Sequence, residues 1–498
     1  MYRILSVLFF LLFLLPVYPQ DDVDSQIIKG LEYSNNFQWE KSEEIYNKIT
    51  AKYPDDPRGW FFKARNSAWA YLSNKSQADY NEFFRLCDLA LSKSEKRADN
   101  NSKDETALFI TGMAYNYRAV VYGKAESYVN AVWALKKTNS YLRTLVATDK
   151  NFCDAYLGLG IYNLALSEIP SSFKWVLSAA GISGDKNTGL SCLRKAAKGA
   201  KFLKAESQYY LSQIYTDNLL NYSAAAGQLR PIIAQYPQNS LFLYSYATLL
   251  MKQKKLQEAE NYLNKVIKTD TNQKFRQVAS YAYFSLGDIY FRQNQFAKAA
   301  ECYHKFLKSN SFREYTGIVN LRLGYSYEFA GKRSYAVKCF EAAQNGNQKF
   351  EEDVYAKRKG ETFAKRTIAE TEEKVIRGAN CVEAGNYAEA ISILNDALRQ
   401  AKTERLKAEA YLHLSDALYE TGKYSESLGC AQKIRDLNPE GEKWILPFAL
   451  FNEARNYYKM GEQGKAKEAL NQAGKENSHD FEKKLNLMVN NLTRSINH

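Results

Sequence analysis

A block of six residues occurs twice in the middle of this chain, at a constant shift of 37 positions. Leu286, Gly287, Tyr290, Ala299, Cys302 and Tyr303 recur as Leu323, Gly324, Tyr327, Ala336, Cys339 and Phe340. A fixed shift of this length is typical of stacked copies of one helical hairpin, because each copy buries its apolar face only against the next. The block therefore predicts a chain that builds an extended binding surface.

The two halves of the block have the spacing of two packed helices. Leu-Gly-x-x-Tyr belongs to the first helix and Ala-x-x-x-Tyr/Phe to the second, with apolar side chains at i, i+3 and i+4. Gly and Ala lack bulk, so the helices can approach closely where they lie. No alternating strand pattern with hairpin turns is present, and we expect an all-α fold.

The pattern resembles the tetratricopeptide repeat, W-x2-L-G-x2-Y followed by A-x3-F and P. Further units in the same register are found along most of the chain: Gly30, Tyr33, Tyr46 and Pro54; Tyr215, Ala225, Leu229 and Pro237; Ala247, Leu250, Ala259 and Leu263; Gly378, Ala390 and Leu394; Leu414, Leu418, Ile434 and Pro439; and Ala454, Tyr457, Ala466 and Leu470. The resemblance implies a superhelical solenoid of stacked antiparallel helix hairpins.

The repeats divide into two predicted arrays. The first covers residues 21–345 and the second covers residues 374–498. Residues 346–373 are densely charged with both signs and have a thin apolar stripe. We expect them to form a solvated bridging helix, bent near Gly360, that links the arrays.

The hairpin turn at residues 165–185 departs from the repeat, because it is long and apolar where such turns are short and polar. Phe173, Trp175 and Leu177 are its largest apolar side chains. Two interpretations remain open at this point. The three side chains either fold back to plug a groove or cap the stack, or form an exposed hairpin that contacts a partner or a lipid surface.

The context of this insertion resembles the tetratricopeptide-repeat protein 39 family over residues 154–200. A Gly-rich first helix with Asn-x-x-x-Ser, a Pro turn, an apolar segment and Gly-x-x-Gly-Asp follow one another in the same order. The resemblance implies a shared architecture, in a family linked to outer membranes and lipid-associated bodies.

Residues 1–20 have the composition of a signal peptide. Arg3 precedes an apolar run from Ile4 to Leu15, which is shorter than the roughly 20 residues of a membrane span. We expect cleavage near Gln20, with an uncleaved anchor as the alternative. The mature chain would then be exported, and periplasmic or peripheral to the outer membrane if the source is bacterial.

Side chains that could carry catalysis are few and scattered. The four histidines are His304, His413, His479 and His498, and they form no metal-ligand cluster. We expect no enzymatic activity, no catalytic or metal site and no cofactor. The net charge of +13 is not concentrated in dense basic tracts, and an exported protein is not expected to meet nucleic acid.

Five of the seven cysteines occupy packing positions of the repeat, and the other two, Cys87 and Cys153, lie in less regular segments. Cys302 and Cys339 precede the large apolar residue of a second helix, and Cys381 takes the Tyr position of a first helix. Equivalent positions of different hairpins are too far apart for a disulfide. We expect buried thiols that act as small hydrophobes.

The concave groove is the predicted site for a protein or peptide partner, because first helices line the groove in repeat stacks. The inward positions are Tyr244, Lys252, Phe284, Asp288, Phe291, Arg292, Tyr325, Phe451, Arg455 and Tyr458. Aromatic rings with scattered cations can hold an extended peptide or a helix. Alternatively, some of these rings pack against neighbouring helices.

The leading functional hypothesis is an exported scaffold that binds another protein through this groove, with envelope assembly as the candidate process. The alternative is a peripheral membrane or lipid-associated protein that acts through the insertion at 165–185.

Overall fold

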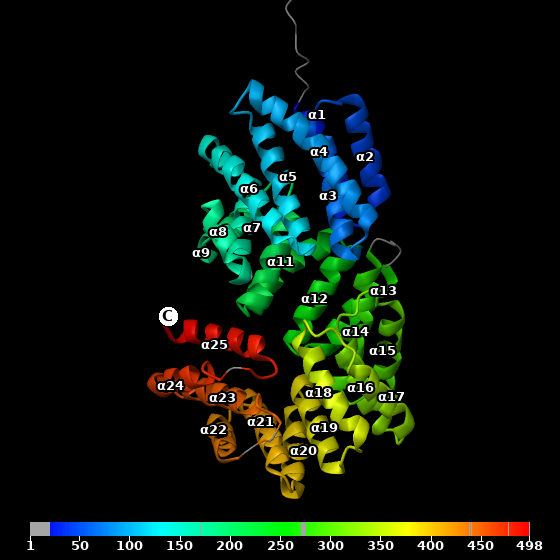
Figure 1. Ribbon diagram of the computed structural model, residues 1–498, viewed down its shortest axis with the longest axis vertical. Coiled ribbons are helices and arrows are strands. Elements are labelled where there is room, and N and C mark those ends of the chain that lie inside the picture. The colour runs from blue at the N-terminus through cyan, green and yellow to red at the C-terminus, as the bar shows by residue number, and fades with distance from the viewer. Residues whose placement is uncertain are drawn as a thin grey trace, which may run out of the picture. The chain divides into compact units, whose positions relative to one another are not determined.

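The computed structural model describes residues 20–169, 171–269, 275–437, 439, 441–476 and 478–497. Helices joined by short turns make up these residues, and no strand occurs among them (Figure 1). The predicted all-α solenoid of helix hairpins is confirmed. None of the described helices has the length and apolar character needed to cross a bilayer.

The chain divides into two compact units, residues 1–207 and 208–498. The helices of the first unit are α1 (Gln20–Asn35), α2 (Trp39–Lys52), α3 (Pro57–Asn74), α4 (Gln77–Asn100), α5 (Glu105–Lys124), α6 (Tyr128–Thr148), α7 (Ala155–Glu168), η1 (Ser171–Phe173), α8 (Lys174–Ala180) and α9 (Lys186–Gly199). Helix α10 (Lys204–Gln213) begins in the first unit and ends in the second.

The second unit contains the regular repeats. Its elements are η2 (Ile214–Asn218), α11 (Tyr222–Gln235), α12 (Ser240–Lys252), α13 (Leu256–Thr269), α14 (Arg276–Arg292), α15 (Phe296–Ser309), α16 (Thr316–Glu328), α17 (Arg333–Ala343), α18 (Glu351–Lys365), α19 (Glu370–Ala384), α20 (Tyr387–Gln400), α21 (Glu404–Glu420), α22 (Tyr424–Lys433), η4 (Ile434–Asp436), α23 (Ile445–Lys459), α24 (Gln463–Ala473) and α25 (Glu482–Asn497). The predicted division at 346–373 differs from this one and stays a prediction, and residues 1–19 of the predicted signal peptide lie outside the described residues.

The Gly–aromatic pairs of the repeat hold each hairpin together. Gly287 of α14 lies against the ring of Tyr303 on α15, and Gly324 of α16 lies against Phe340 on α17 in the same way. A methyl group on either glycine would overlap the ring. Tyr303 and Phe340 are fully buried, so the repeat register read from the sequence places both residues in the core.

A filled interior closes the first unit. The rings of Phe62 on α3 and Phe109 on α5 lie 5.8 and 6.1 Å from the ring of Phe202. Helices α3 and α5 therefore both pack against the segment that follows α9. Arg65 of α3 donates to Glu206 of α10 at 2.9 Å, and both side chains are buried. The first unit therefore has aromatic and ionic groups where an open stack would have a groove.

Helix α18 corrects the expectation that this charged helix is solvated, whereas its bridging role stays a prediction. The helix continues through Gly360, and the chain leaves the helical conformation at residues 366–369. Asp353 and Lys359 of α18 are both buried. The sequence pattern predicted exposure because charged residues are usually solvated. Asp353 can be buried because it accepts hydrogen bonds from the backbone N–H groups of Ile318 and Asn347.

All seven cysteines are free thiols, which agrees with the expectation that they form no disulfide framework. Cys87, Cys302, Cys381 and Cys430 are buried. Burial raises the pKa of Cys302 and Cys381 to about 11, so these thiols stay protonated near neutral pH.

Candidate functional site

The structure places the predicted groove residues at three levels of exposure. Asp288, Phe291, Tyr325 and Phe451 are buried, Lys252 is exposed, and the half-buried residues are Tyr244, Phe284, Arg292, Arg455 and Tyr458. Their role in binding a partner stays a prediction.

Several of these side chains join one hairpin to the next. Asp288 accepts a hydrogen bond from Tyr303 Oη at 2.9 Å and forms an ion pair with Arg322 of α16. The rings of Phe291 and Tyr325 stack at 6.3 Å. These contacts connect α14 to α15 and α16, which is the packing alternative that the sequence left open.

The C-terminal candidates are likewise engaged within the second unit. Arg455 pairs with Asp416 at 2.5 Å and lies 4.0 Å from the ring centroid of Tyr419. Tyr458 Oη donates to the backbone oxygen of Ser495 on α25 at 3.3 Å. Helix α25 thus covers part of the surface that the register assigned to a groove.

A seam forms where α19 lies against the turns of earlier hairpins. Lys254, in the turn between α12 and α13, donates from Nζ to the backbone oxygen of Val382 and to Tyr387 Oη, both at 3.0 Å. Asn294, in the turn between α14 and α15, accepts from Asn380 Nδ2 at 2.9 Å. We call these contacts of α19 with the two turns the α19 seam.

The seam residues occupy backbone positions that favour glycine. Lys254 and Asn294 have φ angles of 60° and 57°, and the equivalent turns of later hairpins use Gly331 and Gly385 with φ angles of 70° and 86°. The two exceptions supply the side chains that reach α19. Neither residue was predicted to belong to a site, and the available signal was a Lys and an Asn at a turn position that later repeats give to Gly.

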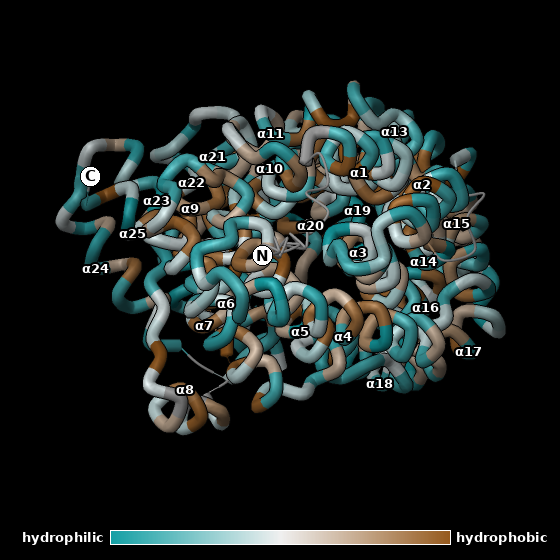
Figure 2. The backbone as a smooth tube through the Cα atoms, turned by 90° about the horizontal axis from the view of Figure 1, so that it is seen from above, coloured by the Kyte–Doolittle hydropathy of each residue, from teal (hydrophilic) through white to brown (hydrophobic). Residues whose placement is uncertain are grey.

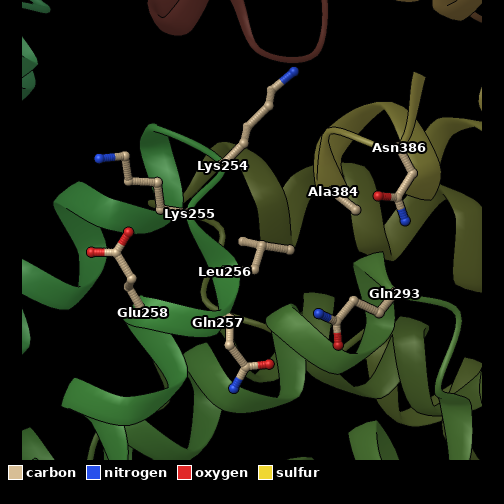
Figure 3. A pocket seen from close by; sticks show the side chains of 8 residues that line it. All are labelled: Lys254, Lys255, Leu256, Gln257, Glu258, Gln293, Ala384 and Asn386. Carbon is tan, nitrogen blue, oxygen red and sulfur yellow. The ribbon is translucent and has the colours of Figure 1, made fainter. Parts of the chain in front are cut away.

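An open cleft of about 290 Å³ lies along the seam. Figure 3 shows that residues from α13 and its preceding turn form one side and the α19–α20 turn forms the other. The lining residues are Lys254, Lys255, Leu256, Gln257, Glu258, Gln293, Ala384 and Asn386. Amine, amide and carboxylate groups dominate this lining, which suits hydrogen bonding to a peptide main chain. We call it the seam cleft.

A charged group borders the seam cleft. Glu383, next to the lining residue Ala384, lies 3.7 Å from Arg292, and its side chain is 57% exposed. Partial desolvation opposes ionisation of Glu383, but the positive charges of Arg292, Lys484, Lys254 and His413 outweigh that effect and lower its pKa.

In the insertion of the first unit, some large apolar side chains fold back and one is exposed, so each of the two interpretations holds in part. The ring of Phe173 lies 4.9 Å from that of Tyr128 on α6, and Leu177 packs against Val132 and its neighbours. Trp175, in contrast, is 64% exposed. The insertion therefore folds back through Phe173 and Leu177 and presents Trp175 to solvent.

No group of three or more His, Cys, Asp or Glu side chains is placed to hold a metal ion in the part of the chain that the structure describes. The site features are a polar cleft, a charged border and an exposed tryptophan. These features suit binding to a macromolecule.

Stacked Gly–aromatic hairpins in one register define the class of protein, a tetratricopeptide-repeat scaffold of the kind that binds protein or peptide partners. The sequence model of the Iml2/Tetratricopeptide repeat protein 39 family matches residues 153–417, more than half of the chain. The chain belongs to this family. A tetratricopeptide-repeat model also matches residues 448–478.

Three solved structures are similar over large parts of their length. A tetratricopeptide repeat protein from Parabacteroides merdae is 16% identical, with 58% of this chain and 98% of that one covered and a TM-score of 0.27. Yeast Tom70 is 13% identical, with 95% and 96% covered and a TM-score of 0.29. YrrB, described as a TPR protein with an unusual peptide-binding site, is 17% identical, with 45% and 95% covered and a TM-score of 0.22.

Proposed function

We propose that the chain is an exported scaffold that binds a protein or peptide partner at the seam cleft of the second unit. The observation that carries the proposal is the cleft itself, with donors and acceptors on both walls. A partner strand could bond to Gln257, Gln293 and Asn386 while Leu256 contacts an apolar side chain.

The test compares partners captured from native cells by chemical crosslinking and mass spectrometry. We expect the variant Lys255→Glu with Asn386→Ala to capture less of the main partner than the wild type does, since both residues line the cleft. Lys402→Glu alters an exposed residue outside the cleft and serves as the matched control. Equal capture by the wild type and the cleft variant would contradict the proposal.

Export and a role in envelope assembly are part of the same proposal, supported by the composition of residues 1–20. N-terminal mass spectrometry of the mature chain tests it. A mature terminus near Gln20 in the exported fraction is expected, and a chain that retains Met1 in the cytoplasm would contradict it.

Peripheral membrane contact through the insertion at 165–185 is a second candidate function. One observation favours it: Trp175 is the most exposed large hydrophobic residue in the described part of the chain. Flotation of the full chain with vesicles tests this candidate, because a scaffold alone would float only with its protein partner.

A further inference from the structure

We propose that a two-helix face of the first unit, which α6 and α8 build together, binds the surface of a bilayer that contains anionic phospholipid. The inference rests on the second candidate function and deepens it. It adds residues of α6 that lie outside the insertion, and it specifies the lipid chemistry.

Helices α6 and α8 run side by side in the same direction. Phe173, just before α8, contacts Tyr128 at the start of α6, and Val176 packs against Val132 one turn further along both helices. Both valines are buried, with 0% and 2% exposure for Val132 and Val176. Helices α6 and α8 are in contact, and Figure 2 shows hydrophobic colour along α8.

This pairing turns two tryptophans to one side. Trp133 follows Val132 and Trp175 precedes Val176, so in parallel helices of the same hand both project from the same side of the pair. Trp133 is 46% exposed and Val129, one turn before it, is 38% exposed. Of the six exposed large hydrophobic residues in the described part of the chain, Val129, Trp133 and Trp175 lie here. We call these three residues the tryptophan face.

The two helices that form the tryptophan face carry charged side chains of one sign only. Helices α6 and α8 contain four Lys and Arg residues and no Asp or Glu. Lys136 Nζ lies 5.1 Å from the ring centroid of Trp133, and Lys137 is exposed beside it. Anionic headgroups attract such basic residues.

The combination of residues favours a lipid surface over a protein partner. Tryptophan is enriched at membrane interfaces, where the ring has an apolar and a wet side. Lysine extends its amine to the headgroups while its stem covers apolar surface, whereas protein interfaces are depleted in lysine. A Trp–Lys face therefore matches the headgroup region more closely than it matches a protein surface.

The face is held in place before it binds. Beyond α8, Tyr162 Oη donates to the backbone oxygen of Ser183 at 3.0 Å, and Asn163 Oδ1 accepts from the backbone N–H of Asp185 at 3.1 Å. These bonds attach the end of the insertion to α7. Binding then costs little ordering entropy, because the supporting helices are already fixed.

The experiment is flotation of the full chain with neutral phosphatidylcholine vesicles and with vesicles that contain about one third phosphatidylglycerol. We expect flotation on the anionic vesicles, with weaker binding as salt is raised, because salt screens the lysines. Lys136→Gln with Lys137→Gln should reduce partitioning roughly thirty-fold. Trp133→Ala with Trp175→Ala should abolish flotation at an unchanged melting temperature, since both side chains are exposed.

Tyr335→Ala, which removes another exposed aromatic ring of the described chain, is the matched control and should float like the wild type. Equal flotation on neutral and anionic vesicles would overturn the lipid specificity and leave the membrane candidate standing. No flotation on either vesicle would overturn both. Flotation that survives loss of both tryptophans would overturn the assignment of the face.

Discussion

At the scale of single residues, each regular hairpin depends on a glycine that is in close contact with an aromatic ring of the second helix. Gly324 faces the buried ring of Phe340, and the register from the sequence places this pair correctly. The buried ionic groups are different, because a charge in the sequence does not show whether it will meet a partner. Lys359 Nζ and Glu442 Oε1 lie 2.5 Å apart, and both side chains are buried, yet the sequence alone would place both residues on the surface.

Gly324→Ala should destabilise the second unit by about 1–3 kcal/mol, because the added methyl group overlaps the ring of Phe340. Gly429→Ala is the control, since no atom lies within 4 Å of a methyl group there and alanine favours a helix. Thermal unfolding measures both, and equal melting temperatures for the two variants would contradict the packing account.

Glu442→Gln should cost about 3–5 kcal/mol, because it leaves Lys359 and part of the Arg358 site without their carboxylate in the interior. The equilibrium free energy of unfolding in urea measures the loss. Glu462→Gln removes a partly exposed partner of Lys465 and should change stability little. A loss below 1 kcal/mol for Glu442→Gln would show that the ion pairs of Glu442 with Lys359 and Arg358 contribute little to stability.

Acid should weaken the fold through Glu372. Burial opposes its ionisation, but Arg366, the backbone N–H of Ala369 and Arg405 outweigh that effect and lower the pKa to about 2. A lowered folded-state pKa adds stability above the unfolded value, so this contribution is lost as pH falls from about 4.5 toward 2. Unfolding free energies at several pH values should fall less steeply for Glu372→Gln, and an identical pH slope would contradict the assignment.

At the scale of elements, the repeat predicts which helices pair but not which distant elements meet. Hairpins α14–α15 and α16–α17 follow from the recurring block, because each pairing is local. The α19 seam joins Lys254 to Val382, 128 positions away, and depends on the path of every hairpin between them. The same path determines that Phe291 and Tyr325 are buried, so the register could place them inward without showing whether they stay open.

Lys254→Gly should loosen the seam without unfolding the hairpins. Glycine suits the φ of 60° at this turn, so the variant removes the side-chain contacts of Lys254 with α19 and α20 without straining the turn. Hydrogen exchange of backbone amides near Val382 should become faster while α14 and α15 stay protected. Lys255→Ala is the control, and unchanged exchange in the Lys254 variant would argue against the seam.

At the scale of the whole molecule, the chain has two compact units with different interiors. The first unit is closed by Arg65, Glu206 and a cluster of phenylalanines, and its distinguishing surface is the tryptophan face. The second unit has the regular repeats and the seam cleft. The sequence could predict the class from the repeat and the interruption at 165–185, since both are local patterns. It could not show the closed first unit, because Arg65 and Glu206 lie 141 positions apart.

The two units should respond separately to a change in one interior. Arg65→Met removes a buried cation from the pair with Glu206, and we expect an earlier unfolding transition for the first unit alone. Calorimetry together with proteolysis at increasing temperature would assign each transition to a unit. A uniform shift of every transition would show that the chain unfolds as one cooperative body.

Site-specific photo-crosslinking in the native cell tests the central claim most directly, which is that the seam cleft holds the partner. A photoreactive residue at Gln257, in the cleft, is compared with one at Lys402, which is exposed outside it. We predict one dominant crosslinked protein from position 257 that Asn386→Ala weakens and that position 402 does not yield. The same products from both positions, or none from position 257, would contradict the account.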